Sequence, residues 1–195
     1  MKIRNICVYC GSSPGQNPAY AQAATLLAKA LCKRDIGLVF GGGAVGIMGI
    51  VADAMLENGG EVTGVIPKAL AVKELAHYGL TELHVVASMH ERKAMMAELA
   101  DGFIALPGGW GTLEEIFEML TWAQLGFHEK PCGLLNIDGY YNDLIGFLEN
   151  AFEQQFVNPL YRPILMQADQ PTQLLDLFAG YQAPKVRKWM GEDEL

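Results

Sequence analysis

The chain has 195 residues, of which 51% are hydrophobic and 18% are charged. This composition suits one compact domain with a sizeable core and no long disordered region. A formal net charge of −8 argues against a nucleic-acid-binding protein, and no apolar run approaches membrane-spanning length. We therefore expect neither nucleic acid nor membrane as a partner, and any bound anion must be held by local dipoles and a few cations.

From the N-terminus onward, short apolar runs alternate with segments of helical periodicity. Strands are expected at residues 3–9, 37–40, 62–66, 83–87, 103–106, 133–137 and 164–166. Helices are expected at residues 19–34, 47–58, 89–100, 113–125, 141–155 and 172–178. Because the strands are apolar on consecutive residues, they should be buried on both faces, as in a parallel sheet. The predicted fold class is α/β, a single-domain, doubly wound, mostly parallel and Rossmann-like sheet with helices on both faces.

The pattern of strands and helices fades after Gly180. Residues 1–180 are therefore expected to form the domain, and residues 181–195 an acidic C-terminal tail. In a doubly wound sheet, ligands bind at the carboxyl ends of the strands, near the point where the strand order reverses. Four loops should reach that edge of the sheet: residues 11–13, 41–43, 88–90 and 107–112.

The cysteines favour a reducing compartment. Four cysteines without framework spacing, after an N-terminus that lacks the apolar core of a signal peptide, predict a cytoplasmic protein. Cys7 and Cys10 have C-x-x-C spacing, but an odd offset along a strand places two side chains on opposite faces. We expect ordinary core or loop thiols, without a redox or zinc role.

A glycine-rich segment, Gly41-Gly42-Gly43-Ala44-Val45-Gly46, fits G-x-G-x-x-G between a strand and a helix. A dinucleotide site also needs an acid at the end of the next strand, for the ribose hydroxyls. That strand ends Val65-Ile66-Pro67-Lys68 without one. The segment is predicted to lie near a nucleotide without forming an NAD site; the alternative is a tight turn that lets a helix and a strand pack closely.

The next motif, Ser88-Met89-His90-Glu91, is an S-x-x-E capping box that places Arg92 and Lys93 in the first or second turn of a helix. Cations there oppose the helix dipole. Two interpretations remain open on the sequence: a solvated basic pair, or a pair that faces a bound anion.

The stretch Pro107-Gly108-Gly109-Trp110-Gly111-Thr112-Leu113-Glu114-Glu115 joins an apolar strand to a helix. Glycines at the start of a helix leave backbone N–H groups free to hold a phosphate. Thr112 to Glu115 also fits T-x-x-E, so Glu115 is predicted to be a capping carboxylate in the first turn, a reactive group, or both. The four histidines show no ligand spacing, and neither a catalytic triad nor a metal site is expected.

With these motifs identified, the chain closely resembles the Lonely Guy (LOG) family of phosphoribohydrolases, which release free cytokinin from its riboside 5′-monophosphate. The likeness runs from Cys10-Gly11-Ser12-Ser13 to the segment 131–141, and its most specific part is the Arg92-Lys93 pair with P-G-G-x-G-T-x-x-E. Many members of the family carry the label "lysine decarboxylase". The resemblance implies a nucleotide-monophosphate-binding domain, a homodimer or larger homo-oligomer with its site near the subunit interface, and no cofactor or metal.

The resemblance also assigns roles by position. It makes Arg92 and Glu115 the catalytic pair, with Arg92 holding Glu115 ionised. The implied substrate-binding residues are Glu74, Arg92, Lys93, Gly108, Gly109, Trp110, Gly111, Thr112, Glu115 and Thr121. The expected reaction is hydrolysis of the N-glycosidic bond of adenosine 5′-monophosphate or its N6-substituted derivatives, in cytokinin activation or nucleotide salvage.

Other functions fit the sequence less well. A non-catalytic nucleotide or pterin-cofactor carrier would share the fold, since fold alone does not fix function, but it would not need Arg92 with Glu115. A nicotinamide oxidoreductase lacks its ribose acid. A pyridoxal-dependent decarboxylase needs a Schiff-base lysine, and the best placed candidate, Lys93, is expected in a turn that faces phosphate.

Overall fold

The computed structural model describes residues 2–71 and 76–185. Seven strands are found in this part of the chain, and all of them pair in parallel in one sheet with the order β4-β3-β2-β1-β5-β6-β7. The strands are β1 (Asn5–Tyr9), β2 (Gly37–Phe40), β3 (Val62–Pro67), β4 (Glu82–Val86), β5 (Gly102–Ala105), β6 (Cys132–Leu135) and β7 (Leu165–Ala168). The predicted parallel sheet is therefore confirmed.

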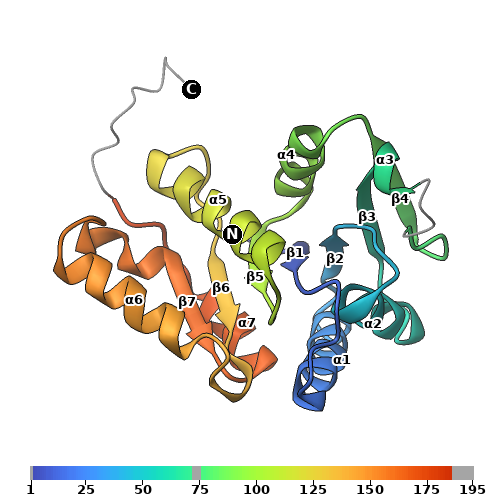
Figure 1. The fold of residues 1–195 in the computed structure, drawn as a ribbon, viewed down its shortest axis with the longest axis horizontal. Helices are drawn as coiled ribbons and strands as arrows, with labels where there is room; N and C mark the ends of the chain where they lie inside the picture. The colour runs from blue at the N-terminus through green and yellow to red at the C-terminus, as the bar shows by residue number, and fades with distance from the viewer. Residues whose placement is uncertain (1, 72–75, 186–195) are drawn as a thin grey trace.

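Helices connect the strands and cover both faces of the sheet (Figure 1). They are α1 (Pro18–Cys32), α2 (Gly46–Glu57), the short α3 (Lys68–Leu70), α4 (Met89–Leu99), α5 (Trp110–Leu125), α6 (Asn142–Glu153) and α7 (Pro171–Ala179), with 3₁₀ segments η2 (Ile137–Gly139) and η3 (Pro159–Ile164). Each predicted helix is present with ends shifted by a few residues. The predicted cap of α1 is also confirmed, because the Asn17 side chain accepts a hydrogen bond from Ala19 N and Pro18 follows the cap.

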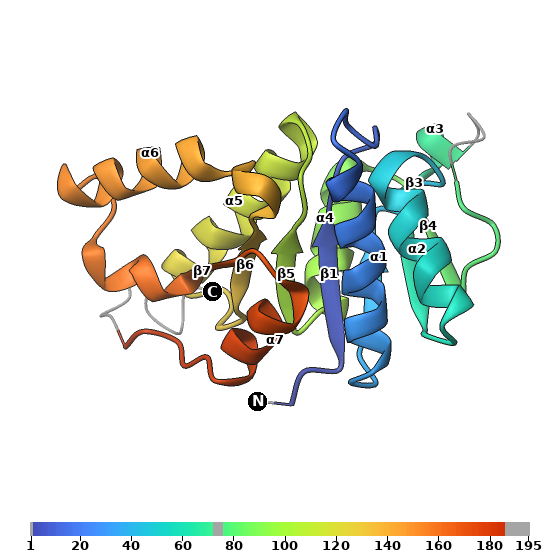
Figure 2. The ribbon, with the colours of Figure 1, turned by 90° about the horizontal axis from the view of Figure 1, so that it is seen from below.

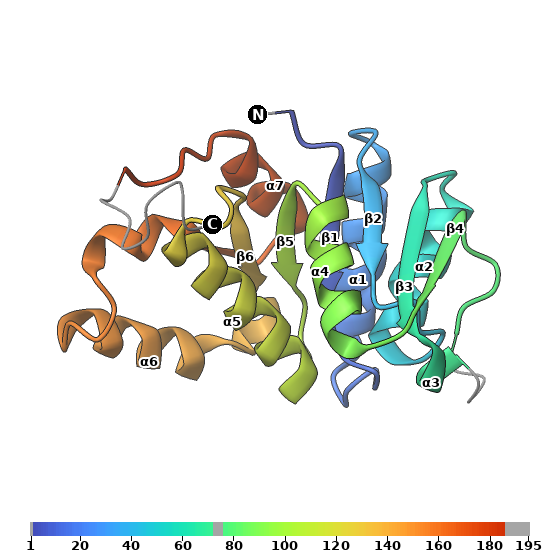
Figure 3. The same ribbon diagram turned by 90° about the horizontal axis from the view of Figure 1, so that it is seen from above.

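The two faces of the sheet carry separate hydrophobic clusters. Helices α1, α2 and α7 cover one face (Figure 2), whereas α4 and α5 cover the other (Figure 3). In β1, Ile6 and Val8 point into the first cluster, and Cys7 and Tyr9 into the second. Burial of consecutive residues on opposite faces is the reason why the strands are apolar along their whole length.

Cys7 and Cys10 lie on opposite faces of the sheet, as their spacing predicts. Cys7 packs under α4 and α5, whereas Cys10 belongs to the cluster of α1 and α2. All four cysteines are free. Burial raises the pKa of the Cys7, Cys10 and Cys132 thiols well above the usual range, so these thiols stay protonated and behave as small apolar side chains.

The strand order reverses between β1 and β5. The chain passes from β1 outward through β2, β3 and β4, returns to the other side of β1 as β5, and continues outward to β7. Val8 of β1 accordingly pairs with Phe40 on one side and with Ile104 on the other. The carboxyl ends of β1 and β5 therefore define the switch point, where ligands of this fold class bind.

Candidate active site

The loops that follow β1, β2 and β5 meet at the switch point, as the sequence predicts. Gly11 N donates to Pro107 O (3.1 Å), which ties the loop after β1 to the loop after β5. Gly11 O in turn accepts from Ile47 N in the first turn of α2 (3.0 Å). Gly46 packs so closely on the loop after β1 that an added Cβ would lie 2.3 Å from the Ser12 carbonyl carbon. The first turn of α2 is thus tied to the loop after β1 through Ile47 N.

Helix α4 begins with the predicted cap. The Ser88 hydroxyl accepts from Glu91 N (3.1 Å), and Glu91 Oε2 accepts from Ala87 N (2.7 Å). In a standard capping box the glutamate side chain accepts from the N–H of the cap residue itself, whereas here it accepts from the residue before it. The two hydrogen bonds still cap the start of the helix. Arg92 follows in the second turn, and it is only 9% exposed.

The guanidinium of Arg92 connects three segments at this edge. Its Nε donates to Val65 O of β3 (3.1 Å), and its Nη1 contacts Glu115 Oε1 of α5 (3.1 Å). Its Nη2 has no acceptor among the described residues and lies against Gly41, where an added Cβ would stand 1.9 Å away. The first glycine of the G-x-G-x-x-G segment therefore makes room for the arginine.

Burial changes the protonation of Glu115. The residue is 8% exposed, and loss of solvation raises the pKa of its carboxyl to about 7, although the positive charge of Arg92 acts in the opposite direction. Arg92 therefore acts on Glu115 in the expected direction, toward the ionised form, and desolvation opposes it. A carboxyl pKa of about 7 suits a general acid or base that works near neutral pH.

The predicted capping box at Thr112 is also wrong. Helix α5 begins at Trp110, its N-cap is Gly109, and no side chain caps it. Thr112 is thus the third helical residue, buried at 3% exposure, and Glu115 lies in the second turn. Gly109 adopts φ −96° and ψ −149°, so the chain turns into the helix earlier than the T-x-x-E pattern indicates.

The start of α5 exposes a cluster of backbone donors. The N–H groups of Gly108, Gly109, Trp110 and Gly111, which we call the amide cluster, have no hydrogen-bond acceptor among the described residues. A side chain added at Gly109 or Gly111 would meet nothing within 4 Å. Free donors at the positive end of a helix, with open space in front, form a site for an anion such as phosphate.

Lys93 is held between carboxylates. Its Nζ contacts Glu118 Oε1 (3.0 Å) and Glu114 Oε1, both on α5. Burial alone would lower the pKa of Lys93, but the contacts with these two carboxylates raise it above its usual value. Lys93 is therefore a charged link between α4 and α5, beside the Arg92–Glu115 pair.

The remaining predicted residues are more scattered. Trp110 is 90% exposed at the start of α5. Thr121 lies later in the same helix, exposed, with its hydroxyl donating to Phe117 O (2.8 Å), and it lines a hollow of about 150 Å³ beside α6 rather than the Arg92–Glu115 site. Glu74 lies outside the described residues.

The contacts of three residues at the site were not predicted. Gly41 shapes the space for Arg92. The hydroxyls of Tyr140 and Tyr141 donate to Gly108 O and Leu106 O, each at 2.6 Å. The Tyr140-Tyr141 pair was visible in the sequence, but no local pattern connects it with a loop more than thirty residues earlier.

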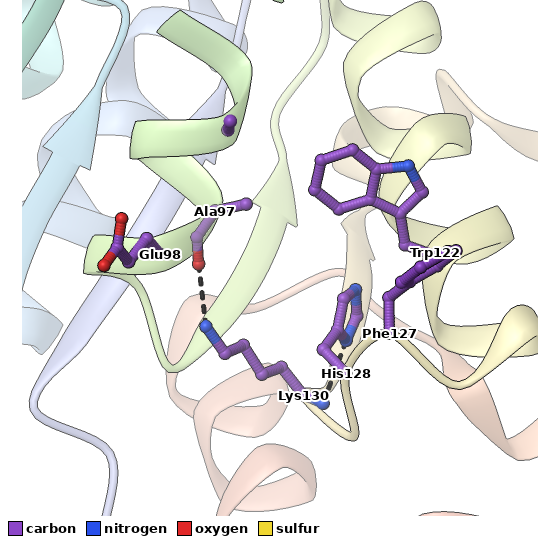
Figure 4. Close-up of a pocket in the computed structure, with 7 residues that line it drawn as sticks. Ala97, Glu98, Trp122, Phe127, His128 and Lys130 are labelled. Carbon is purple, nitrogen blue, oxygen red and sulfur yellow. Dashed lines mark hydrogen bonds between the residues drawn. The ribbon is translucent and has the colours of Figure 1, made fainter. Parts of the chain in front are cut away.

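The described part of the chain also has hollows away from the Arg92–Glu115 pair. One of about 460 Å³ lies between α4 and the end of α5, lined by Ala94, Ala97, Glu98, Trp122, Phe127, His128 and Lys130 (Figure 4). Its lining is mainly apolar, and Lys130 Nζ is engaged with Ala97 O (2.7 Å). Among residues 2–71 and 76–185, no cluster of three or more His, Cys, Asp or Glu could hold a metal, and no helix is long and apolar enough to cross a membrane.

Comparisons with known proteins identify relatives along most of the chain. Residues 48–178 match the family described as "Possible lysine decarboxylase". The chain is 51% identical over 180 residues, covering 92% of it and 72% of the relative, to a probable cytokinin riboside 5′-monophosphate phosphoribohydrolase of Oryza sativa subsp. japonica. It is 49% identical to a cytokinin riboside 5′-monophosphate phosphoribohydrolase of Arabidopsis thaliana, covering 93% of this chain and 83% of that protein.

Solved structures share the fold at lower identity. A molybdenum cofactor binding protein from Rippkaea orientalis superimposes with a TM-score of 0.69 at 21% identity, covering 92% of this chain and 98% of that one. The Moco carrier protein from Chlamydomonas reinhardtii gives a TM-score of 0.67 at 18% identity, covering 92% of this chain and 100% of that one. At such identities the likeness establishes the Rossmann-like architecture and nothing about the ligand.

Proposed function

The chain belongs to the Lonely Guy family of cytokinin riboside 5′-monophosphate phosphoribohydrolases, and we propose that it hydrolyses the N-glycosidic bond of adenosine 5′-monophosphate and its N6-substituted derivatives. The products are the free base and ribose 5-phosphate. The observation that carries this proposal is the buried Arg92–Glu115 pair, 3.1 Å apart, beside the amide cluster at the switch point of the sheet. The pair supplies the chemistry, and the cluster holds the phosphate.

The chemistry of the bond suits a carboxylate. Cleavage of an N-glycosidic bond develops positive charge at the ribose C1′, as in glycoside hydrolysis. Ionised Glu115 stabilises this charge or activates the attacking water. Its pKa of about 7 lets the same group accept a proton from water and release it again near neutral pH. Arg92 orients the carboxylate through Nη1 and keeps Nη2 available for the substrate.

Phosphate binding orients the reacting bond. The amide cluster and the dipole of α5 hold the 5′-phosphate away from C1′, so the energy of that contact positions the sugar relative to Glu115. The protein has a formal net charge of −8, so this local positive end, and not the overall field, attracts the nucleotide. Gly108, Gly109, Trp110, Gly111 and Thr112 are assigned to phosphate, and Lys93 and Glu74 to the rest of the nucleotide. Thr121, which lines a separate hollow, is not assigned to the nucleotide of this protomer.

The decarboxylase label fits the site poorly. A Schiff-base lysine must lose its proton to attack a carbonyl, whereas the contacts of Lys93 with Glu114 and Glu118 raise its pKa. A carrier function is less supported because a carrier has no need for a buried acid that titrates near pH 7. Pyridoxal absorbance in the purified protein would contradict our rejection of the decarboxylase function.

The finer properties of the protein are proposed from the family. We expect a homodimer or larger homo-oligomer, and the apolar groove of α4 and α5 in Figure 4 offers a surface for a second copy; light scattering coupled to gel filtration measures the mass. Four free cysteines, three of them buried, support a cytoplasmic location.

The decisive experiment incubates the purified protein with N6-isopentenyl-AMP and with AMP, and follows free base and ribose 5-phosphate by chromatography. Base release is expected from at least one substrate, and no release at high enzyme concentration would refute the hydrolase. Glu115→Gln should lower kcat by about 10³-fold, within the range for a general base. Glu114→Gln is the matched control, because Glu114 neighbours the site and is exposed; it should retain most of the activity.

A further inference from the structure

The loop between β5 and α5 is held by its carbonyl groups. Three successive carbonyl oxygens each accept one hydrogen bond: Leu106 O from the Tyr141 hydroxyl (2.6 Å), Pro107 O from Gly11 N (3.1 Å), and Gly108 O from the Tyr140 hydroxyl (2.6 Å). The next carbonyl, Gly109 O, accepts from Leu113 N within α5 (3.1 Å). Every carbonyl from Leu106 to Gly109 therefore faces a protein donor.

Fixing a carbonyl also fixes the amide that follows it. A trans peptide is planar, and its C=O and N–H groups point in opposite directions. When the Tyr140 hydroxyl holds Gly108 O, the N–H of Gly109 must point away from Tyr140. The same peptide geometry applies to Pro107 O and the N–H of Gly108. The bonds to Pro107 O and Gly108 O thus determine where the N–H groups of Gly108 and Gly109 point. Leu106 O precedes Pro107, which has no N–H, so the Tyr141 hydroxyl orients no donor and only anchors the start of the loop.

The tyrosines are themselves held in place. Tyr141 is only 1% exposed, and its backbone N–H donates to Asn136 Oδ1 (2.8 Å). The Tyr140 ring lies edge-on to the rings of Tyr141 and Tyr20, with centroids 4.9 and 5.5 Å away. Both hydroxyls come from the turn that enters α6, so a separate segment of the chain sets the geometry of the glycine loop.

We propose that Tyr140 is a positioning residue for the 5′-phosphate, which holds the peptide between Gly108 and Gly109 so that the N–H of Gly109 points at the anion together with the rest of the amide cluster. This inference rests on the proposed function for the identity of the anion. Without the hydroxyl of Tyr140, the peptide between Gly108 and Gly109 is free to rotate, and the amide cluster loses its alignment. Neither tyrosine touches the reacting bond.

The test removes single hydroxyls. Tyr140→Phe should raise KM for the nucleotide roughly three- to tenfold with kcat changed less than twofold, the pattern of lost uniform binding. Tyr141→Phe removes a bond to the carbonyl that precedes Pro107, so it should raise KM less than Tyr140→Phe does. Tyr20→Phe is the matched control, because Tyr20 packs on Tyr140 but its hydroxyl makes no hydrogen bond among the described residues; its KM should stay within twofold of the unmodified protein.

A second measurement separates this inference from the proposed reaction. Calorimetric titration with ribose 5-phosphate reports phosphate binding without catalysis, and Tyr140→Phe should weaken it by the same factor as KM. If the protein binds ribose 5-phosphate through Tyr140 but releases no base, the reaction is wrong and the positioning role stands. If base is released but Tyr140→Phe changes neither KM nor the dissociation constant of ribose 5-phosphate, or if Tyr20→Phe has an equal effect, the positioning role is wrong. Absence of both binding and base release refutes both.

Discussion

The glycine-rich loops after β2 and after β5 look alike in sequence, but their glycines meet different surroundings. In the loop after β2, an added Cβ would collide with Arg92 at Gly41, approach Ile66 at Gly42, and strike the Ser12 backbone at Gly46. These glycines are required because protein atoms occupy the space. The glycines of this loop allow the Arg92 side chain to lie against Gly41 and allow α2 to pack on the loop after β1.

In the loop after β5, only Gly108 is tightly enclosed, with Thr112 and Gly11 against it. Gly109 and Gly111 face open space, and the N–H groups around them have no protein acceptor in the described part of the chain. Here the glycines leave room for something that is not protein. A glycine loop therefore indicates a phosphate site only when its backbone N–H groups are free. At the start of α2, Ile47 N already donates to Gly11 O, so this loop is the weaker candidate for phosphate.

The sharpest way to break this comparison is Gly41→Ala. The new methyl would stand 1.9 Å from Arg92 Nη2, so the guanidinium must move and lose its alignment with Glu115. A displacement of this order costs about 10²-fold in kcat/KM when it affects a catalytic group. The kcat/KM of the purified variant measures the effect, provided that its circular dichroism spectrum matches that of the unmodified protein. Retention of more than half the activity would show that the arginine adapts, and that Gly41 is not a determinant of the site.

The acid that lies between the two loops gives a second test, through pH. Because burial raises the pKa of Glu115 to about 7, the ionised fraction and hence kcat/KM should rise about tenfold between pH 6 and pH 8 if the carboxylate is the active form. The profile of kcat/KM against pH measures this directly. A profile that is flat across this interval would mean that the ionisation of Glu115 does not limit the reaction.

The same pKa has a consequence for stability, of opposite sign. A carboxyl whose pKa is higher in the folded than in the unfolded state stabilises the protein most below the unfolded value and loses this contribution as the pH rises through the folded value. For Glu115 the interval runs from 4.5 to about 7, and the loss is on the order of 3 kcal/mol. Urea unfolding at pH 5 and pH 8 should show the fall in the unmodified protein and a smaller fall in Glu115→Gln.

Gly109→Ala tests the open loop. The methyl group meets no protein atom, so stability should change by less than about 1 kcal/mol, in keeping with surface substitutions. It does enter the space assigned to phosphate, and KM should rise roughly fivefold, which corresponds to about 1 kcal/mol of lost binding. Unchanged KM together with unchanged stability would place the phosphate elsewhere.

The sequence predicts most of the fold and less of the site. Strands buried on both faces and alternating helices follow from local apolar patterns, and the positions of Arg92 and Glu115 at one edge follow from the topology of a parallel sheet. The start of α5 could not be predicted, because Thr112-Leu113-Glu114-Glu115 is a sound local cap that the backbone of Gly109 overrides. The fit of Arg92 against Gly41 and the hydroxyl contacts of Tyr140 and Tyr141 join segments far apart in the chain, where no local pattern carries the information.

The smallest expected effect comes from Gly111→Ala, which measures how far the phosphate site extends into α5. Gly111 is the second residue of the helix, and its added Cβ would meet nothing within 4 Å. Alanine is the better helix former, by roughly 0.5–1 kcal/mol in a helix interior, so the free energy of unfolding should rise by up to this amount. A Cβ on the side of the helix does not block its N–H, and KM should therefore change less than twofold. A rise in KM equal to that of Gly109→Ala would instead mean that phosphate lies over the whole first turn. Position 111 would then tolerate no side chain, for the same reason as position 109.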